Sequence, residues 1–136
     1  MVSTPSRRKI LIVEDEPAIR NALYVLLAGL GCDGDVAYDS GQALSMIRQD
    51  RFDAVLLDLR CANLPPDQMV SAISELRPSL VGRVLVITGE VTDSKTLATL
   101  QQCALPYLSR DRVTSELWQR LRGLLEFNQP TARSIT

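Results

Sequence analysis

The sequence predicts a single α/β domain built on a doubly wound, five-stranded parallel sheet. Short β-branched runs alternate with longer stretches of helical periodicity, which is typical of a parallel sheet covered by helices. The chain has 136 residues, of which 46% are hydrophobic. Folding at this length removes roughly two-thirds of the extended chain's surface from water, so one apolar core needs no disulfide or structural metal. We place the domain at residues 9–127, between polar tails at 1–8 and 128–136.

The first two strand-helix units occupy the first third of the chain. The first strand covers residues 10–13, and the helix after it begins at Pro17, a residue that a first helical turn tolerates. Gly31 ends that helix. A weak strand at residues 35–38 follows, and Ser40 is the predicted cap of the second helix.

The third strand, residues 54–57, is apolar on both faces, as a central strand of a parallel sheet should be. A loop with two prolines leads from it to a helix that Pro78 closes. The remaining elements are a strand at residues 84–87, a modest helix at 93–102, a short strand at 107–108 and an amphipathic helix at 113–125. Right-handed connections between adjacent strands then give an open sheet with helices on both faces.

The charge balance excludes several partners. Lys and Arg number 15 and Asp and Glu 16, so the formal net charge is −1. With no basic block beyond Arg7-Arg8-Lys9, the chain lacks the cationic stripe of nucleic-acid binders. No apolar run approaches the roughly 18 residues that span a bilayer, and the N-terminus does not resemble a signal peptide. We expect a cytoplasmic protein that contacts neither nucleic acid nor membrane directly.

The chain contains no histidine, which excludes a Ser-His-Asp triad, a Cys-His dyad and every His-ligated zinc site within it. Any imidazole must come from a partner. Its three cysteines, Cys32, Cys61 and Cys103, are an odd number without a CxxC pair, which fits a reducing compartment. We interpret them as buried or incidental thiols, and we expect carboxylates near Cys61 to raise its pKa and blunt its reactivity.

Polar side chains follow the strands at the edge where such folds bind ligands. Residues 14–16 (Glu-Asp-Glu) follow the first strand, Asp58 the third, Thr88 the fourth and Arg110 the fifth. Two unit charges about 4 Å apart repel by roughly 4 kcal/mol at an effective dielectric of 20, so converging carboxylates must bind a cation or a proton. All-oxygen ligation favours Mg²⁺, with Thr88 and Arg110 placed to bind a phosphoryl group at Asp58.

At these residues the chain resembles the receiver domain of two-component response regulators. The resemblance covers residues 9–127 and rests on three motifs in order: ILIVEDEP for the acidic pocket, DAVLLDLR for the phosphoacceptor strand and VLVITGE for the switch strand. It implies a flavodoxin-like (βα)5 fold. It also implies a phosphoprotein switch and no enzyme, beyond self-catalysed phosphotransfer and autodephosphorylation.

The resemblance assigns roles to single residues. It makes Asp58 the acceptor of a phosphoryl group from the phosphohistidine of a sensor histidine kinase or phosphotransfer protein. Asp15 becomes a direct Mg²⁺ ligand, Glu14 its acidic companion and the carbonyl of Arg60 a backbone ligand. The histidine that the chain lacks then belongs to the partner.

The remaining implied roles concern the switch. Thr88 is the switch hydroxyl and Tyr107 the switch aromatic, although simple packing is the commoner role of such a tyrosine. Relatives usually bind partners through the face formed by the fourth helix, the fifth strand and the fifth helix. We expect a downstream protein or an attached output domain there, and the same face is a candidate for homodimerisation. The chain departs from the family at Arg110-Asp111, where a lysine usually precedes a cis-proline.

Several interpretations compete with a phosphoacceptor. A degenerate receiver would keep the fold and bind a partner without phosphorylation, which the departures at Arg110 and in the loop after Asp58 favour. A haloacid dehalogenase-type hydrolase normally has a second Asp two residues after its nucleophile, where this chain has Arg60. No GxGxxG or GxxxxGK loop follows the first strand, which argues against a nucleotide site.

Four residues near the site leave finer alternatives open. Glu16 is as well explained by a favourable interaction with the helix dipole as by a role in the site. Arg110 can instead be a solvated charge in a turn, paired with Asp111. Arg60 and Glu90 flank the mouth of the site in relatives, so opposite charges there could pair, close the entrance and slow hydrolysis.

Overall fold

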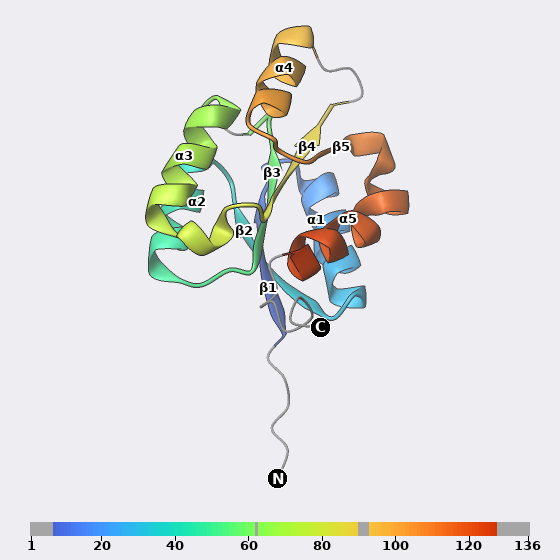
Figure 1. The fold of residues 1–136 in the computed structure, drawn as a ribbon. Helices are drawn as coiled ribbons and strands as arrows, with labels where there is room; N and C mark the ends of the chain where they lie inside the picture. Colours follow the sequence, from blue (N-terminus) through green and yellow to red (C-terminus); the bar gives the residue numbers. More distant parts are fainter. Residues whose placement is uncertain (1–6, 62, 90–92, 128–136) are drawn as a thin grey trace, which may run out of the picture.

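The computed structural model describes residues 7–61, 63–89 and 93–127. Five strands alternate with five helices (Figure 1). The strands are β1 (Arg8–Val13), β2 (Cys32–Ala37), β3 (Ala54–Asp58), β4 (Val84–Thr88) and β5 (Tyr107–Ser109). The helices are α1 (Pro17–Gly29), α2 (Ser40–Gln49), α3 (Pro66–Leu76), α4 (Ser94–Gln102) and α5 (Val113–Phe127), with 3-10 turns η1 (Pro78–Leu80) and η2 (Arg110–Arg112). The predicted α/β class is confirmed.

All strand pairs are parallel, in the order β2-β1-β3-β4-β5. The order reverses direction at β1, so the loops after β1 and β3 leave the same edge of the sheet as neighbours. Every residue of β3 is buried, as its apolar sequence predicts. The register pairs Val13 with Leu57 and Asp58 with Ile87, which brings the end of β3 level with the end of β4.

Helices cover both faces of the sheet, with α1 and α5 on one and α2 and α3 on the other (Figure 1). Each face buries its own apolar core, and alternate residues of the central strands contribute to opposite cores. Leu23 and Leu27 of α1 meet Leu117 and Leu121 of α5 in one core. No helix in the described parts of the chain is long and apolar enough to cross a membrane.

Two local predictions are wrong. The second strand begins at Cys32, three residues earlier than expected, because pairing with β1 starts at Arg8 and holds a polar segment in the edge of the sheet. The cap of α2 is Asp39, whose carboxylate accepts a hydrogen bond from the Gln42 amide at 2.8 Å. Ser40 instead occupies the first helical position. A carboxylate is also favoured at a helix N-terminus because it complements the helix dipole.

Candidate functional site

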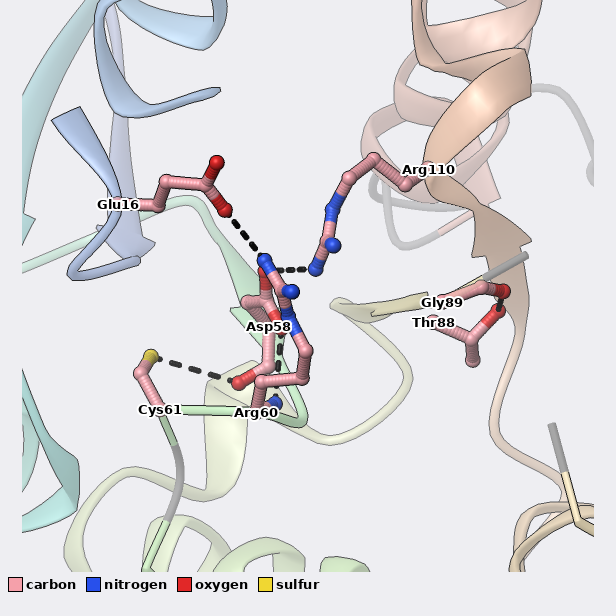
Figure 2. A network of polar contacts seen from close by, with 7 residues as sticks. All are labelled: Glu16, Asp58, Arg60, Cys61, Thr88, Gly89 and Arg110. Carbon is pink, nitrogen blue, oxygen red and sulfur yellow. Dashed lines mark hydrogen bonds and ion pairs between the residues drawn. The ribbon is translucent and has the colours of Figure 1, made fainter. Parts of the chain in front are cut away.

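Asp58 ends β3 with its side chain only 1% exposed. The backbone amide of Arg60 donates to its Oδ1 at 2.8 Å, and Nη2 of Arg110 donates to its Oδ2 at 2.7 Å (Figure 2). The Arg60 guanidinium lies farther off, with Nε 3.9 Å from Oδ1. A buried carboxylate with two charge-assisted or backbone donors is held in one orientation, with free lone pairs left on both oxygens.

Glu14 follows β1 and is completely buried. Among the described residues, neither of its carboxylate oxygens has a hydrogen-bond partner. Burial and the neighbouring Asp58 carboxylate raise the pKa of Glu14 to about 8, although Arg110 and Arg60 act in the opposite direction. The predicted convergence of Glu14 on Asp58 is therefore present, and it leaves a buried acid that needs a proton or a cation.

Asp15 is exposed at the mouth of the same pocket. One carboxylate oxygen each from Glu14 and Asp15 and the sulfur of Cys61 lie within 4.8 Å of one another. Burial, followed by the charge of Asp58, raises the pKa of the Cys61 thiol to about 12. The expected direction holds, but burial is a larger cause than the carboxylates that we invoked.

Arg60 forms an ion pair across the entrance, from its Nη2 to Oε2 of Glu16 at 2.5 Å. Figure 2 shows its guanidinium between Glu16 and the Asp58 carboxylate. Glu16 is the N-cap residue of α1 but its side chain makes no capping hydrogen bond, so the contact with Arg60 describes it better than the helix dipole does. The other predicted partner of Arg60, Glu90, lies outside the described residues.

Arg110 occupies the first position of η2, and its side chain is 21% exposed. The structure favours the site over the solvated-turn alternative, because the guanidinium reaches Asp58 instead of Asp111. Asp111 accepts a hydrogen bond from the Ser109 hydroxyl at 2.6 Å. All peptide bonds of the described residues are trans, this loop included.

Thr88 and Tyr107 lie beside the pocket on the two neighbouring strands. Thr88 is buried, and its hydroxyl donates to the Gly89 carbonyl at 3.2 Å, turned away from Asp58 (Figure 2). Tyr107 is half-buried against the core. Between β4, α4, β5 and α5 lies a hollow of about 390 Å³ lined by both residues and by Arg112, Glu116 and Arg120.

The donor set suits a small hard cation. Glu14, Asp15 and Asp58 offer carboxylate oxygens, and the backbone of Arg60, which offers a carbonyl oxygen, is held beside Asp58 by its amide. Mg²⁺ binds few protein oxygens and keeps several waters, and the exposure of Asp15 leaves room for them. The two orphaned oxygens of Glu14 are the observation that a bound cation explains, so the residues present fit Mg²⁺.

Sequence reasoning missed two contacts at this site. It did not pair Arg60 with Glu16, although both residues follow neighbouring strands and carry opposite charges. It placed carboxylates near Cys61 but gave the thiol no role and no hydrogen bond. The only sequence signal for the thiol was its position three residues after Asp58, where the loop turns back and Sγ donates to the Asp58 carbonyl at 3.4 Å.

The fold and pocket together define a doubly wound α/β domain in which carboxylates that can bind a cation lie at the carboxyl edge of the sheet. Residues 10–122 match the model of the response regulator receiver domain. The chain belongs to this family, which confirms the resemblance seen in its motifs.

Curated relatives include the response regulator MprA of Mycobacterium avium, 32% identical over 122 residues, which are 90% of this chain and 53% of the relative. The DNA-binding response regulator MtrA of Mycolicibacterium smegmatis is 31% identical over 123 residues, 90% of this chain and 53% of the relative. The chain thus spans about half the length of the curated relatives it matches.

Solved structures of similar fold are more distant in sequence. The signal receiver domain of a histidine kinase from Syntrophus aciditrophicus has a TM-score of 0.79 at 19% identity, covering 91% of this chain and 94% of that one. The receiver domain of a sensor histidine kinase from Pseudomonas aeruginosa has a TM-score of 0.75 at 22% identity, covering 89% and 99%. That second structure has a magnesium ion coordinated in its active-site cleft.

Proposed function

We propose that this receiver domain accepts a phosphoryl group on Asp58 from a partner's phosphohistidine and thereby switches a protein-binding face. The observation that carries the proposal is the pair of buried acids, Asp58 and Glu14, with Arg110 bound to Asp58 at one edge of the sheet. The carboxylate of Asp58 is the nucleophile, and family membership makes an aspartate here the expected acceptor.

Bound Mg²⁺ supplies positive charge that neutralises the phosphoryl oxygens at Asp58. Glu14, Asp15, Asp58 and the Arg60 carbonyl are the residues that would hold it. Arg110 stands where relatives have lysine, and its guanidinium already reaches Oδ2 of Asp58. From that position it can move onto a phosphoryl oxygen with a second donor to spare, so we assign it the countercharge role.

The switch rests on Thr88 and Tyr107. In the structure the Thr88 hydroxyl faces the Gly89 carbonyl, so contact with a phosphoryl group requires the hydroxyl to rotate away from that carbonyl. The vacated space lies beside the hollow that Tyr107 lines, between α4 and α5. Phosphorylation would thus shift the population between two arrangements of this face. We propose that a downstream protein, an attached output domain or a second copy of the chain binds there.

The test is the intact mass of the protein after incubation with Mg²⁺ and acetyl phosphate. We expect a gain of a single phosphoryl group that a chelator abolishes. Asp58→Asn should remove the gain while leaving the fold intact, since Asn keeps the shape and one acceptor oxygen.

The matched control is Asp111→Asn, because Asp111 is an acid in the same loop cluster that contacts Ser109 and not the pocket. It should be phosphorylated like the wild type. No mass gain from acetyl phosphate or from a cognate kinase, with the fold intact, would overturn the proposal. The remaining function would then be a phosphorylation-independent interaction module, in which the ion pair of Arg110 with Asp58 would be structural.

A further inference from the structure

We infer that Glu14, Asp15 and Cys61 form a second, thiolate-containing metal site that takes a thiophilic divalent ion of the Zn²⁺ or Co²⁺ class. The juxtaposition is of two carboxylate oxygens and one sulfur within 4.8 Å of one another. Ligands at about 2.0–2.3 Å around one tetrahedral ion lie roughly 3.3–3.8 Å apart, so the three atoms need to close in by at most about 1.5 Å to share an ion.

The burial of Glu14 points independently to a cation here. Its side chain is fully buried and neither oxygen has a hydrogen-bond partner among the described residues. A buried carboxylate in that condition is costly unless a positive charge or a proton compensates it. An ion shared with Asp15 and Cys61 would compensate the charge of Glu14.

The sulfur distinguishes this site from the magnesium site proposed above. Mg²⁺ selects oxygen ligands, and the thiol of Cys61 offers it nothing. Thiolate ligands select softer ions, and a mixed sulfur and oxygen set with room for water suits Zn²⁺ or Co²⁺. As the metal-sulfur bond forms, the thiol proton leaves to solvent, and the weak contact from Sγ to the Asp58 carbonyl at 3.4 Å is given up.

Both sites use Glu14 and Asp15, so the two metals exclude one another. A thiophilic ion would remove the acidic pair that Mg²⁺ needs while leaving Asp58 paired with Arg110. Trace zinc would therefore hold the domain in an unphosphorylated state, which makes the site an inhibitory one. The binding itself does not depend on phosphorylation of Asp58.

The test is titration of the full chain with Co²⁺ alone, followed by absorption in the near ultraviolet. A thiolate bound to Co²⁺ gives a charge-transfer band there, whereas carboxylates do not. We expect a band that saturates at a single ion per chain. Cys61→Ser should abolish it and weaken Co²⁺ binding at least about tenfold. Mg²⁺ affinity should change less than about twofold, because serine leaves the oxygen ligands in place.

Cys103→Ser is the matched control, since Cys103 is a half-buried cysteine at the end of α4 outside this cluster. It should keep the band. Asp15→Asn changes only an exposed side chain and should weaken Co²⁺ binding with the band retained, even if Cys61→Ser fails to fold. Absence of a band in the wild type, a band that survives in Cys61→Ser, or unchanged Co²⁺ affinity in Asp15→Asn would overturn the inference.

Measuring phosphorylation of the same protein with Mg²⁺ and acetyl phosphate tests the proposed function separately from the thiolate site. A cobalt band without phosphorylation would sink the proposed function and leave this site standing. Phosphorylation without a cobalt band would do the reverse.

Discussion

The two edges of the sheet use the same kinds of charged residues in opposite ways. At the amino edge, Arg7 pairs with Asp33 at 2.8 Å, with side chains 50% and 60% exposed, and Lys9 pairs with Asp50. At the carboxyl edge, Asp58 and Glu14 are 1% and 0% exposed, and Glu14 has no hydrogen-bond partner among the described residues. Both edges carry acids and bases, but only the carboxyl edge removes acids from water.

The pKa directions express that difference. The hydrogen bond from Lys9 lowers the pKa of the exposed Asp50 carboxyl, so the protein stabilises the ionised form of Asp50. Burial raises the pKa of Glu14 to about 8, so the protein disfavours the ionised form of Glu14. Exposed ion pairs contribute little, whereas a buried charge that loses its partner is severely destabilising. At the carboxyl edge, the ionised carboxylates of Glu14 and Asp58 are therefore destabilising, and a bound metal ion can offset their charge.

The largest expected effect comes from removing the guanidinium of Arg110, which pairs with the buried carboxylate of Asp58. Arg110→Met leaves Asp58 without its countercharge beside Glu14, and we expect a loss of about 3 kcal/mol of unfolding free energy at pH 7 without metal. Urea denaturation measures it, and added Mg²⁺ should restore part of the loss. Arg112→Met is the control in the same turn, because its ion pair with Glu116 is exposed and should contribute at most about 0.5 kcal/mol. Equal losses in the two variants would refute the contrast between the edges.

The next effect is a gain of stability. Because the folded-state pKa of Glu14, about 8, lies above the ordinary glutamate value of 4.5, the folded state holds an extra proton between those pH values. The free energy of unfolding therefore falls as pH rises through that window. Glu14→Gln lacks that proton equilibrium. We expect the metal-free variant to be more stable than the wild type by about 2 kcal/mol at pH 8, with the difference shrinking toward pH 5.

Denaturation of both proteins from pH 5 to 8 measures this difference. Saturating Mg²⁺ should reduce the advantage of the variant, because the metal stabilises the ionised carboxylate that only the wild type has. A difference that stays flat across the pH range would show that Glu14 is ionised throughout, and the account of a strained acid would be wrong.

A smaller effect concerns the entrance to the site. Arg60 and Glu16 are each about half exposed, so their ion pair contributes little to stability. If the Arg60 side chain shields the phosphoryl group from water, Arg60→Ala should shorten the lifetime of the phosphorylated form. We expect up to about fivefold, the rate equivalent of the ~1 kcal/mol that such a pair supplies.

Loss of radiolabelled phosphate after removal of the donor gives the lifetime. Glu16→Gln should shorten it as well, because the guanidinium loses its anchor across the entrance. An unchanged lifetime in both variants would remove the gate hypothesis, whichever acid faces Arg60.

The candidate site could be located from the sequence because the ends of the strands could be predicted from their apolar runs. Apolar runs place Glu14 and Asp58 at one edge, and the parallel order makes them neighbours. The positions of the acidic residues in the sequence do not predict which arginine pairs with which acid, because long side chains have many rotamers. For that reason the contact of Arg110 with Asp58 was open to two interpretations, and that of Arg60 with Glu16 was missed.

The fold errors have the same origin. Strand β2 has the sequence CDGDVA, which carries no apolar alternation over its first half, and only pairing with β1 makes those residues a strand. Asp39 and Ser40 are both good caps, so a shift of one residue in the start of α2 decides between them. Elements with a strong local signal, such as the fully buried β3, were placed correctly.

The smallest expected effect is at the amino edge, where the charged residues are exposed. It tests whether exposed ion pairs contribute less to stability than the buried pair at the carboxyl edge. Asp33→Asn removes the partner of Arg7 but leaves that guanidinium in water, where it is well solvated. We expect a change in unfolding free energy of at most about 0.5 kcal/mol, which vanishes in 1 M salt because exposed charges are screened. The effect of Arg110→Met should survive the same salt, since its partner Asp58 is buried. Salt-resistant loss at both edges would mean that the amino-edge charges are coupled to the core, and burial would no longer explain why only one edge carries a site.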